Sequence, residues 1–346
     1  MNYFIYDREG KKQALLQNVT SIQWKPRYCE EGKAVIYAKA TTDNLKYLVK
    51  FNRIVCQERN EIMFIKSVIP KEDDETVLII SGYMDNLDDR VNINTLTVRN
   101  VESSLLKCVS DNKRGLDINV ADSKGLTAKI PDSETTWLSL RKTIQKYCSL
   151  VGYGYREIVK NNVLNYFEIY SGSRRDEAKF SDDLGNVLAQ RYEVELSKYK
   201  NFAYVLGDDD DGKRRMVTVD MREANEPLME MYVDARDLQR TYKDSSGNEQ
   251  TYSDSEYNEM LGVRGEEKLL ETREGAFVFS FTLNPEDKLI ILGRDYDLGD
   301  IVPVISIKYG LQVYARITGI DFVEEGNEDT KINLILQINS TNRIGG

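Results

Sequence analysis

The sequence predicts a mainly β protein with α+β insertions, and three observations support this fold class. Short runs rich in β-branched and aromatic residues recur through residues 1–98 at the spacing of roughly 8–12 residues that all-β domains show. Similar runs resume after residue 275, and a helical pattern and a highly charged stretch lie between the two blocks. The regular strand spacing is typical of an antiparallel barrel or sandwich.

Residues 1–98 are therefore expected to form one all-β unit. The unit begins with a strand, a turn at residues 7–10 (DREG) and a returning strand. Residues 43–49 are compatible with either a short helix or a loop. The expected strands cover residues 3–6, 14–23, 33–41, 53–58, 61–68 and 76–83.

Residues 99–186 are expected to form an α+β domain. Asn100 is a candidate N-cap for a helix over residues 101–109, because its side-chain oxygen can accept a hydrogen bond from the first turn. Residues 131–133 (PDS) predict the start of a second helix, which Gly152 ends. Two strands joined by Asn161 and Asn162 follow, at residues 154–160 and 163–170. The second helix carries an apolar stripe, interpreted as core packing, that consists of Trp137, Leu138, Leu140, Ile144, Tyr147 and Cys148.

Residues 187–221 and 276–346 are expected to form a second β unit, interrupted by a polar mixed insertion at residues 222–275. The insertion is predicted to hold helices over residues 255–261 and 266–272 and a loop at residues 243–248. The strands expected in the second unit cover residues 193–206, 214–220, 277–283, 288–292, 301–308, 312–322 and 331–339.

The acidic loop at residues 208–212 (DDDDG) is interpreted as a solvated hairpin tip. If Gly212 were the sixth position of an EF-hand loop, the twelfth position would be Thr218, where the loop needs a bidentate Glu. The calcium motif therefore fails.

Composition excludes several chemistries. The chain has no histidine, which removes mechanisms based on imidazole as acid, base or metal ligand. A formal net charge of −10 disfavours binding to nucleic acid or anionic lipid. The four cysteines form no CxxC pair and are interpreted as buried thiols. Nucleotide-binding glycine motifs are absent, no carboxylate has a setting suited to glycosidase chemistry, and no stretch is apolar enough to span a membrane.

We therefore predict no enzyme activity and no catalytic, cofactor or metal site. The residues singled out are Gly299 and Asp300, just before the strand that starts at Ile301. Glycine can adopt positive φ, and aspartate can accept hydrogen bonds within its own turn. The prediction is a structural turn rather than a binding site, and the alternative is a cation site formed with Asp295 and Asp297.

Several segments together resemble the baseplate hub and tail-associated proteins of siphophage tails, a family related to the trimeric hub of contractile tails. At the C-terminal end these segments are residues 295–302 (DYDLGDIV), 314–318 (YARIT) and 332–338 (INLILQI). At the N-terminal end they are residues 21–24 (SIQW), Arg27, Tyr28, Gly32, Ile54, Val55, Gly82, Tyr83, Leu87 and Arg90. Between them lie residues 201–207 (NFAYVLG) and 232–237 (YVDARD).

The resemblance implies a homotrimer in which each subunit contributes two similar antiparallel β-barrels of the tail-tube kind. Three subunits would form a pseudo-sixfold ring that joins the sixfold tail to a threefold tip. The implied partners are a distal tail ring protein, the tape-measure protein and a separate tip, spike or receptor-binding protein, with DNA passing through without specific binding. The implied location is the virion tail, assembled in the bacterial cytoplasm.

An alternative function is a β-rich receptor- or carbohydrate-binding tail protein. That function predicts an exposed aromatic cluster, which some of the 21 tyrosines could supply. The tyrosines that can be placed lie within strand patterns, so core or subunit-interface positions are the simpler interpretation.

Overall fold

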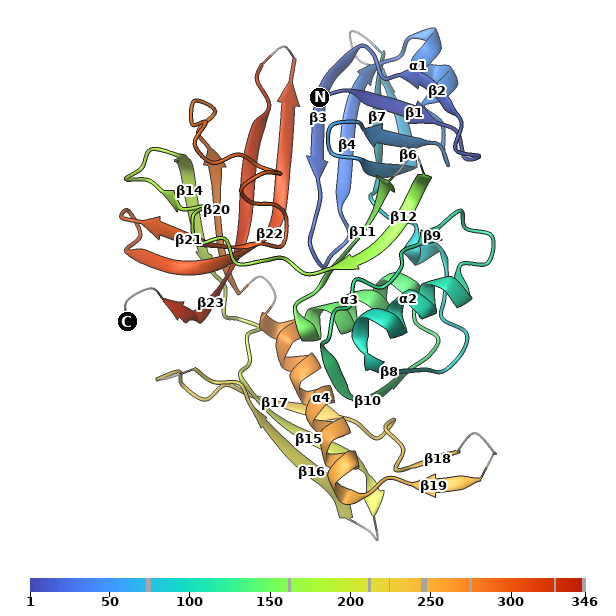
Figure 1. The fold of residues 1–346 in the computed structure, drawn as a ribbon, viewed down its shortest axis with the longest axis vertical. Helices are drawn as coiled ribbons and strands as arrows, with labels where there is room; N and C mark the ends of the chain where they lie inside the picture. The colour runs from blue at the N-terminus through green and yellow to red at the C-terminus, as the bar shows by residue number, and fades with distance from the viewer. Residues whose placement is uncertain are drawn as a thin grey trace.

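The computed structural model describes residues 1–72, 76–160, 163–210, 213–223, 225–243, 248–273, 276–326 and 328–343. In this part of the chain the protein is mainly β with a few helices, as predicted, and most strands belong to one large sheet whose pairings are nearly all antiparallel. Two β-rich halves lie side by side, and the helical region and a smaller sheet lie below them in the view of Figure 1.

The N-terminal half follows the strand order β2-β1-β5-β6-β7-β4-β3. The returning strand expected over residues 14–23 is two strands, because Asn18 adopts a φ of 52° between them. The short segment compatible with helix or loop is helix α1 (Thr42–Tyr47). The strands of this half are β1 (Tyr3–Tyr6), β2 (Lys12–Leu15), β3 (Val19–Lys25), β4 (Lys33–Lys39), β5 (Arg53–Cys56), β6 (Glu61–Glu72) and β7 (Thr76–Tyr83).

The α+β region packs its two helices around their own core. Asn100 caps α2 as predicted, accepting a 3.0 Å hydrogen bond from the Ser103 N–H. The start expected at residues 131–133 is wrong, because those residues lie in β10 and the hydroxyl of Ser139 caps the helix instead. The elements are η1 (Leu87–Asp89), β8 (Leu96–Asn100), α2 (Val101–Asn112), β9 (Asn119–Val120), β10 (Lys129–Thr135), α3 (Leu140–Val151), β11 (Gly154–Lys160) and β12 (Val163–Tyr170).

The apolar stripe is only partly core. Trp137 precedes α3 with a φ of 57° and leaves 70% of its surface exposed, and Leu138 is also exposed. The remaining four stripe residues are buried, and Gly152 ends the helix in a left-handed conformation as predicted. Asn161 and Asn162, the predicted turn between β11 and β12, lie outside the described residues.

The C-terminal half follows the order β14-β20-β23-β22, with β21 on β22 and β13 on β21. The strand expected over residues 288–292 is wrong, since only Leu292 makes an isolated bridge, to Tyr296. The strands are β13 (Phe180–Ser181), β14 (Val187–Val194), β20 (Phe277–Leu283), β21 (Ile301–Ser306), β22 (Leu311–Glu325) and β23 (Lys331–Arg343).

A third, smaller unit contains β15 and β16, which the sequence placed with the second β block. That placement is wrong: these strands pair with each other and with β17 in a separate three-stranded sheet, whose apolar face is covered by helix α4. The two helices expected here are one continuous helix, α4. Gly265 lets α4 lie close to the sheet, because a Cβ added to Gly265 would be 2.7 Å from the Val205 side chain. The elements are β15 (Phe202–Asp210), β16 (Lys213–Asp220), β17 (Glu230–Asp234), β18 (Thr241–Lys243), β19 (Glu249–Thr251) and α4 (Asp254–Arg273).

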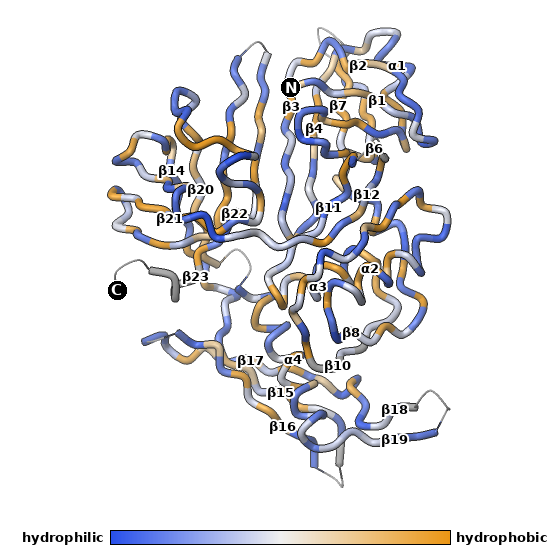
Figure 2. Tube along the Cα trace, in the orientation of Figure 1, coloured by the Kyte–Doolittle hydropathy of each residue, from blue (hydrophilic) through white to orange (hydrophobic). Residues whose placement is uncertain are grey.

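The two β-rich halves share one sheet and one core. The second part of β22 pairs with β3, with Phe322 opposite Trp24, so the sheet runs without a break from one half to the other. Both of these side chains belong to a single cluster of buried apolar residues, and Figure 2 shows hydrophobic segments along strands of both halves. Among the described strands, no backbone pairing closes either half into a ring.

Candidate functional site

The predicted turn lies where three distant segments of the chain meet. These are the residues after β3, the strap at residues 171–175 that leaves β12, and the start of β21. Gly299 donates its N–H to the carbonyl of Ile317 at 2.8 Å and adopts a φ of 95°. A side chain on Gly299 would be strained by this backbone angle, and its Cβ would lie 2.2 Å from the ring of Tyr28.

Tyr28 is the centre of this junction and is only 2% exposed. Its hydroxyl donates to the carbonyl of Gly152 at 2.9 Å and accepts from the N–H of Gly172 at 3.0 Å. A Cβ on Gly154 would lie 2.3 Å from the Tyr28 ring, and one on Gly172 would lie 1.9 Å from the carbonyl oxygen of Gly299. Burial raises the pKa of Tyr28, which keeps the hydroxyl neutral and able to donate.

Asp300 ties the strap to the start of β21. It is 4% exposed, and one carboxylate oxygen accepts from the N–H of Ser173 at 2.7 Å. The other oxygen accepts from Arg175 Nε and from the N–H of Asp297, both at 3.0 Å. The backbone of Ile301 completes the link, donating to the Ser173 carbonyl at 2.9 Å. All of these contacts join parts of the same chain, and a purely structural role for the turn stays a prediction.

Buried ion pairs lie along the seam between the two β-rich halves. Arg59 binds Glu61 at 2.9 Å and Asp297 at 3.4 Å, and Trp24 donates its indole N–H to Glu61 at 2.6 Å. The Arg59 guanidinium also lies 4.7 Å from the centre of the Phe322 ring. Arg59 and Glu61 are largely buried and paired with each other, and Arg59 also reaches the half-exposed Asp297, so neither buried charge is left free for a ligand.

A small cavity of about 30 Å³ adjoins this seam, and the buried carboxyl of Glu157 is part of its lining. One oxygen of Glu157 accepts from the N–H of Asn86 at 2.9 Å, and the other has no hydrogen-bond partner. Burial, reinforced by the nearby Asp85, raises the pKa of Glu157 to about 8. A cavity of this size has room for about one or two water molecules and not for a substrate.

The other candidate groups do not assemble into a reactive site. Within the described ranges, no three Asp, Glu or Cys side chains are placed to hold a metal ion, and this includes Asp295, Asp297 and Asp300. Asp211 and Gly212 of the acidic loop lie outside those ranges. All four cysteines are free; three are buried, and Cys29 is half-buried. No helix in the described chain is long and apolar enough to cross a membrane.

Sequence reasoning located Gly299 and Asp300 but missed the rest of the junction. The sequence identifies Gly152 as the end of a helix and Gly154 as the start of a strand, and neither assignment points to the junction. Their role depends on Tyr28, more than a hundred residues away. That partnership leaves no local pattern in the sequence.

Comparison with known proteins places the chain among phage tail proteins. A family model described as "Siphovirus ReqiPepy6 Gp37-like protein" matches residues 104–336. No curated protein sequence matches the chain.

Solved structures of tail proteins have the same fold over nearly the whole chain. The 43 kDa tail protein of prophage MuSo2 from Shewanella oneidensis matches with a TM-score of 0.64 and 14% identity, covering 98% of each chain. A tail protein from Neisseria meningitidis MC58 matches with a TM-score of 0.63 and 11% identity, covering 98% of this chain and 97% of that one. Prophage tail protein gp18 from Listeria monocytogenes matches with a TM-score of 0.57 and 12% identity, covering 97% and 94%.

Proposed function

The chain belongs to the Siphovirus ReqiPepy6 Gp37-like family of phage tail proteins, and we propose that it is the baseplate hub of the tail. In this proposal three copies form a ring, and each copy contributes two β-barrels. The six barrels match the sixfold tail on one side, and the trimer matches a threefold tip on the other. The role is structural and includes no catalysis.

The observation that carries the proposal is the seam between the two β-rich halves. Strand β22 reaches past its own half and pairs with β3, so the halves join edge to edge within one subunit. A closed ring needs a head-to-tail contact that repeats identically between subunits. The seam supplies such a contact inside the subunit, and a similar contact between subunits would complete the ring.

We propose that residues 1–98 are the first barrel and residues 99–186 the α+β domain. The second barrel is formed by β14 and β20 to β23. The unit of β15 to β19 and α4 is an insertion on the outside of the ring. This division differs from the sequence-based one in moving β15 and β16 out of the second barrel.

The proposed partners are the distal tail ring protein, the tape-measure protein and a separate tip, spike or receptor-binding protein. The protein acts in the tail of the virion after assembly in the bacterial cytoplasm. The ring encloses part of the channel through which the tape-measure protein and DNA pass. A net charge of −10 supports a channel without a large basic patch, because such a patch would retain DNA through counterion release.

Cryo-electron microscopy of purified tails, together with the mass of the chain co-expressed with its distal ring protein, tests the proposal. We expect three copies per tail and a ring of six barrels. A single copy, or six copies with one barrel each around the channel, would rule out the trimeric hub. Tight binding of the assembled ring to DNA at physiological salt would rule out the proposed channel surface.

A further inference from the structure

The three-stranded sheet of the insertion has one face covered by α4 and one face open to solvent. The covered face consists of small and apolar residues, among them Ala203, Val205 and Val233. On the open face, residues opposite one another on β16, β15 and β17 form a regular grid. We call this grid the outer face; its residues are Met216, Thr218 and Asp220 on β16, Leu206, Tyr204 and Phe202 on β15, and Asp234, Tyr232 and Glu230 on β17.

The centre of the outer face is aromatic and exposed. Tyr204 lies directly opposite Tyr232, and the ring of Phe202 lies 5.1 Å from that of Tyr204. Tyr232 is 56% exposed, and Met216, on the opposite edge strand of this face, is 57% exposed. An exposed aromatic cluster of this kind is uncommon on a surface that meets only water.

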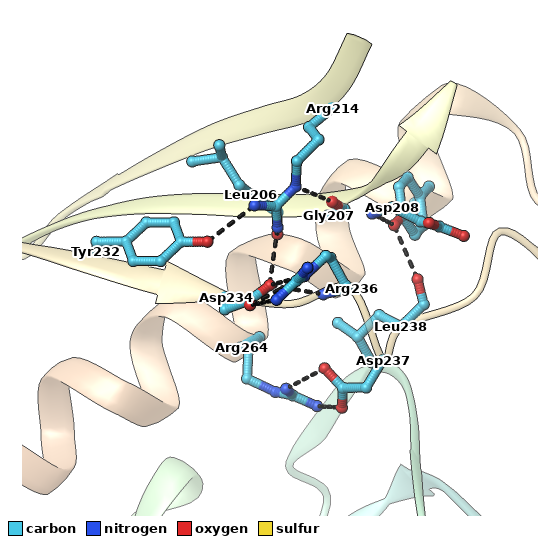
Figure 3. Close-up of polar contacts among 11 residues, drawn as sticks. Leu206, Gly207, Asp208, Arg214, Tyr232, Asp234, Arg236, Asp237, Leu238 and Arg264 are labelled. Carbon is cyan, nitrogen blue, oxygen red and sulfur yellow. Dashed lines mark hydrogen bonds and ion pairs between the residues drawn. The ribbon is translucent and has the colours of Figure 1, made fainter. Parts of the chain in front are cut away.

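The aromatic rings are held in place by hydrogen bonds at their hydroxyl groups. The Tyr232 hydroxyl accepts from Arg214 Nη1 at 2.8 Å, as Figure 3 shows, and the Tyr204 hydroxyl donates to Glu230 at 3.0 Å. Arg214 is on β16 and Tyr232 on β17, so their bond crosses the intervening strand β15. The Tyr232 ring is therefore held along the sheet, with one side toward the sheet and the other toward solvent. A ligand that stacks on a ring already held in place loses little side-chain entropy on binding.

The charges around the rings are paired and cancel. Asp234 binds both Arg214 and Arg236, and Asp220 binds Arg222 through both oxygens. These arginine contacts lower the pKa of Asp220 and of Asp234 to about 2. The carboxylates therefore stay ionised at physiological pH, although the arginines occupy both oxygens of Asp234. Glu230 accepts from the Tyr204 hydroxyl at Oε1, and its Oε2 can accept from a ligand hydroxyl. Because each arginine is already paired, the outer face offers little to a phosphate.

The size of the outer face favours a small or linear ligand over a protein. Three strands about 4.8 Å apart and five residues of about 3.3 Å each give a footprint of roughly 200 Å². A stable protein interface needs about 800 Å² from each partner. Ring faces flanked by ionised carboxylates suit the apolar face and the hydroxyl groups of a sugar ring.

We propose that the outer face binds a neutral oligosaccharide, with a sugar ring stacked on Tyr232 and a sugar hydroxyl donating to the carboxylate of Glu230. The proposal is independent of the trimeric hub, since every residue of the face belongs to one chain. Saturation-transfer NMR on the full chain, with maltohexaose and chitohexaose as separate probes, distinguishes hexose from N-acetylhexosamine recognition. We expect one probe to bind, and Tyr232→Ala to raise its dissociation constant at least tenfold.

Further variants separate loss of the ring from loss of the fold. Tyr232→Phe keeps the ring and should weaken binding by less than Tyr232→Ala does, and Tyr204→Ala should weaken it independently. Phe51→Ala is the matched control, because Phe51 is an aromatic residue of similar exposure, 63%, in the N-terminal half. Thermal melting of each variant shows whether it is folded.

Three results would overturn the proposal. The first is no signal from either probe at millimolar concentration, and the second is binding that Tyr232→Ala leaves unchanged. The third is a different ligand in place of sugar. Binding of single-stranded oligothymidine would assign the outer face to nucleic acid, and self-association that Tyr232→Ala abolishes would assign it to a second copy of the chain.

Discussion

The central junction and the outer face both depend on a tyrosine, but they place it in opposite surroundings. Tyr28 is 2% exposed and Tyr232 is 56% exposed. The hydroxyl of Tyr28 bonds to backbone groups of Gly152 and Gly172, whereas that of Tyr232 bonds to the side chain of Arg214. Tyr28 holds distant segments of the chain together. Tyr232 presents an exposed ring, fixed by Arg214, as the proposed ligand contact.

The junction is packed through glycines, whereas the outer face is ordered through paired charges. At the junction, Gly154 and Gly299 have no side chain because the Tyr28 ring occupies that space. On the outer face, side chains fill the space and paired charges keep the rings in position. We expect substitutions at the junction to change stability and substitutions on the outer face to change binding. Three predictions test this contrast and one concerns the buried carboxyl of Glu157; they are given in order of decreasing effect.

The largest effect is expected for Gly299→Val. The change costs about 1–2 kcal/mol for positive φ and about 1–3 kcal/mol for the collision with Tyr28, so the expected loss of unfolding free energy is about 2–5 kcal/mol. Gly293→Val is the control, because Gly293 has a φ of 83° and nothing within 4 Å of an added Cβ. Urea unfolding should show the control losing only the backbone part. Equal losses in the two variants would show that the junction is not tightly packed.

Asp300→Ala should lower the free energy of unfolding by about 1–3 kcal/mol. It leaves the N–H groups of Ser173 and Asp297 without their buried acceptor. Asp176→Ala, directly after the strap and with its carboxylate 57% exposed, should cost clearly less. Thermal melting beside tail assembly is the measurement. Unchanged stability with lost assembly or lost ligand binding would contradict the structural role and reopen the question of a site at this turn.

Much of the local structure could be predicted from sequence where the signal is local. Asn100 and Gly152 mark helix ends through their own side chain or their own φ, and both were located. The start of α3 was placed too early, because Pro131 and Ser133 resemble a helix start, whereas they lie in strand β10, where Ser133 pairs with Val98 of β8. Tertiary pairing overrode the local pattern at that point.

Strand partners were the hardest feature to predict. Strands β15 and β16 have the same alternating pattern as the strands of the second β block, and only the position of β17 and α4 reveals that they form another sheet. Only part of the junction could be predicted, for the same reason. Gly299 has a local turn signal, whereas Tyr28 looks like any other strand tyrosine until its partners more than a hundred residues away are known.

A third prediction concerns pH and the buried carboxyl of Glu157. Its pKa is about 8 in the folded protein, above the value of an exposed glutamate, so the folded state holds a proton that the unfolded state releases. Stability should therefore fall as the pH rises from about 5 to 8. Glu157→Gln is neutral throughout and keeps an acceptor for the Asn86 N–H, so it should remove at least about 1 kcal/mol of this decline, the equivalent of one pKa unit. Urea unfolding at several pH values measures it, and parallel profiles for the two proteins would contradict the buried, protonated state.

The last prediction compares the same deletion in the two regions, the loss of one tyrosine hydroxyl. Tyr28→Phe should cost about 1 kcal/mol, because the half-buried carbonyl of Gly152 and N–H of Gly172 lose their hydrogen-bond partner. Tyr232→Phe should change the free energy of unfolding by no more than about 0.5 kcal/mol. Water can replace the lost hydroxyl as the acceptor for the exposed Arg214 guanidinium. Both variants keep their rings, so neither creates a large cavity. Chemical unfolding of the two variants under the same conditions therefore measures the contribution of each hydroxyl to the free energy of unfolding. If the two losses are equal, the outer face contributes to the fold as the junction does, and the exposed tyrosine is not held ready for a ligand.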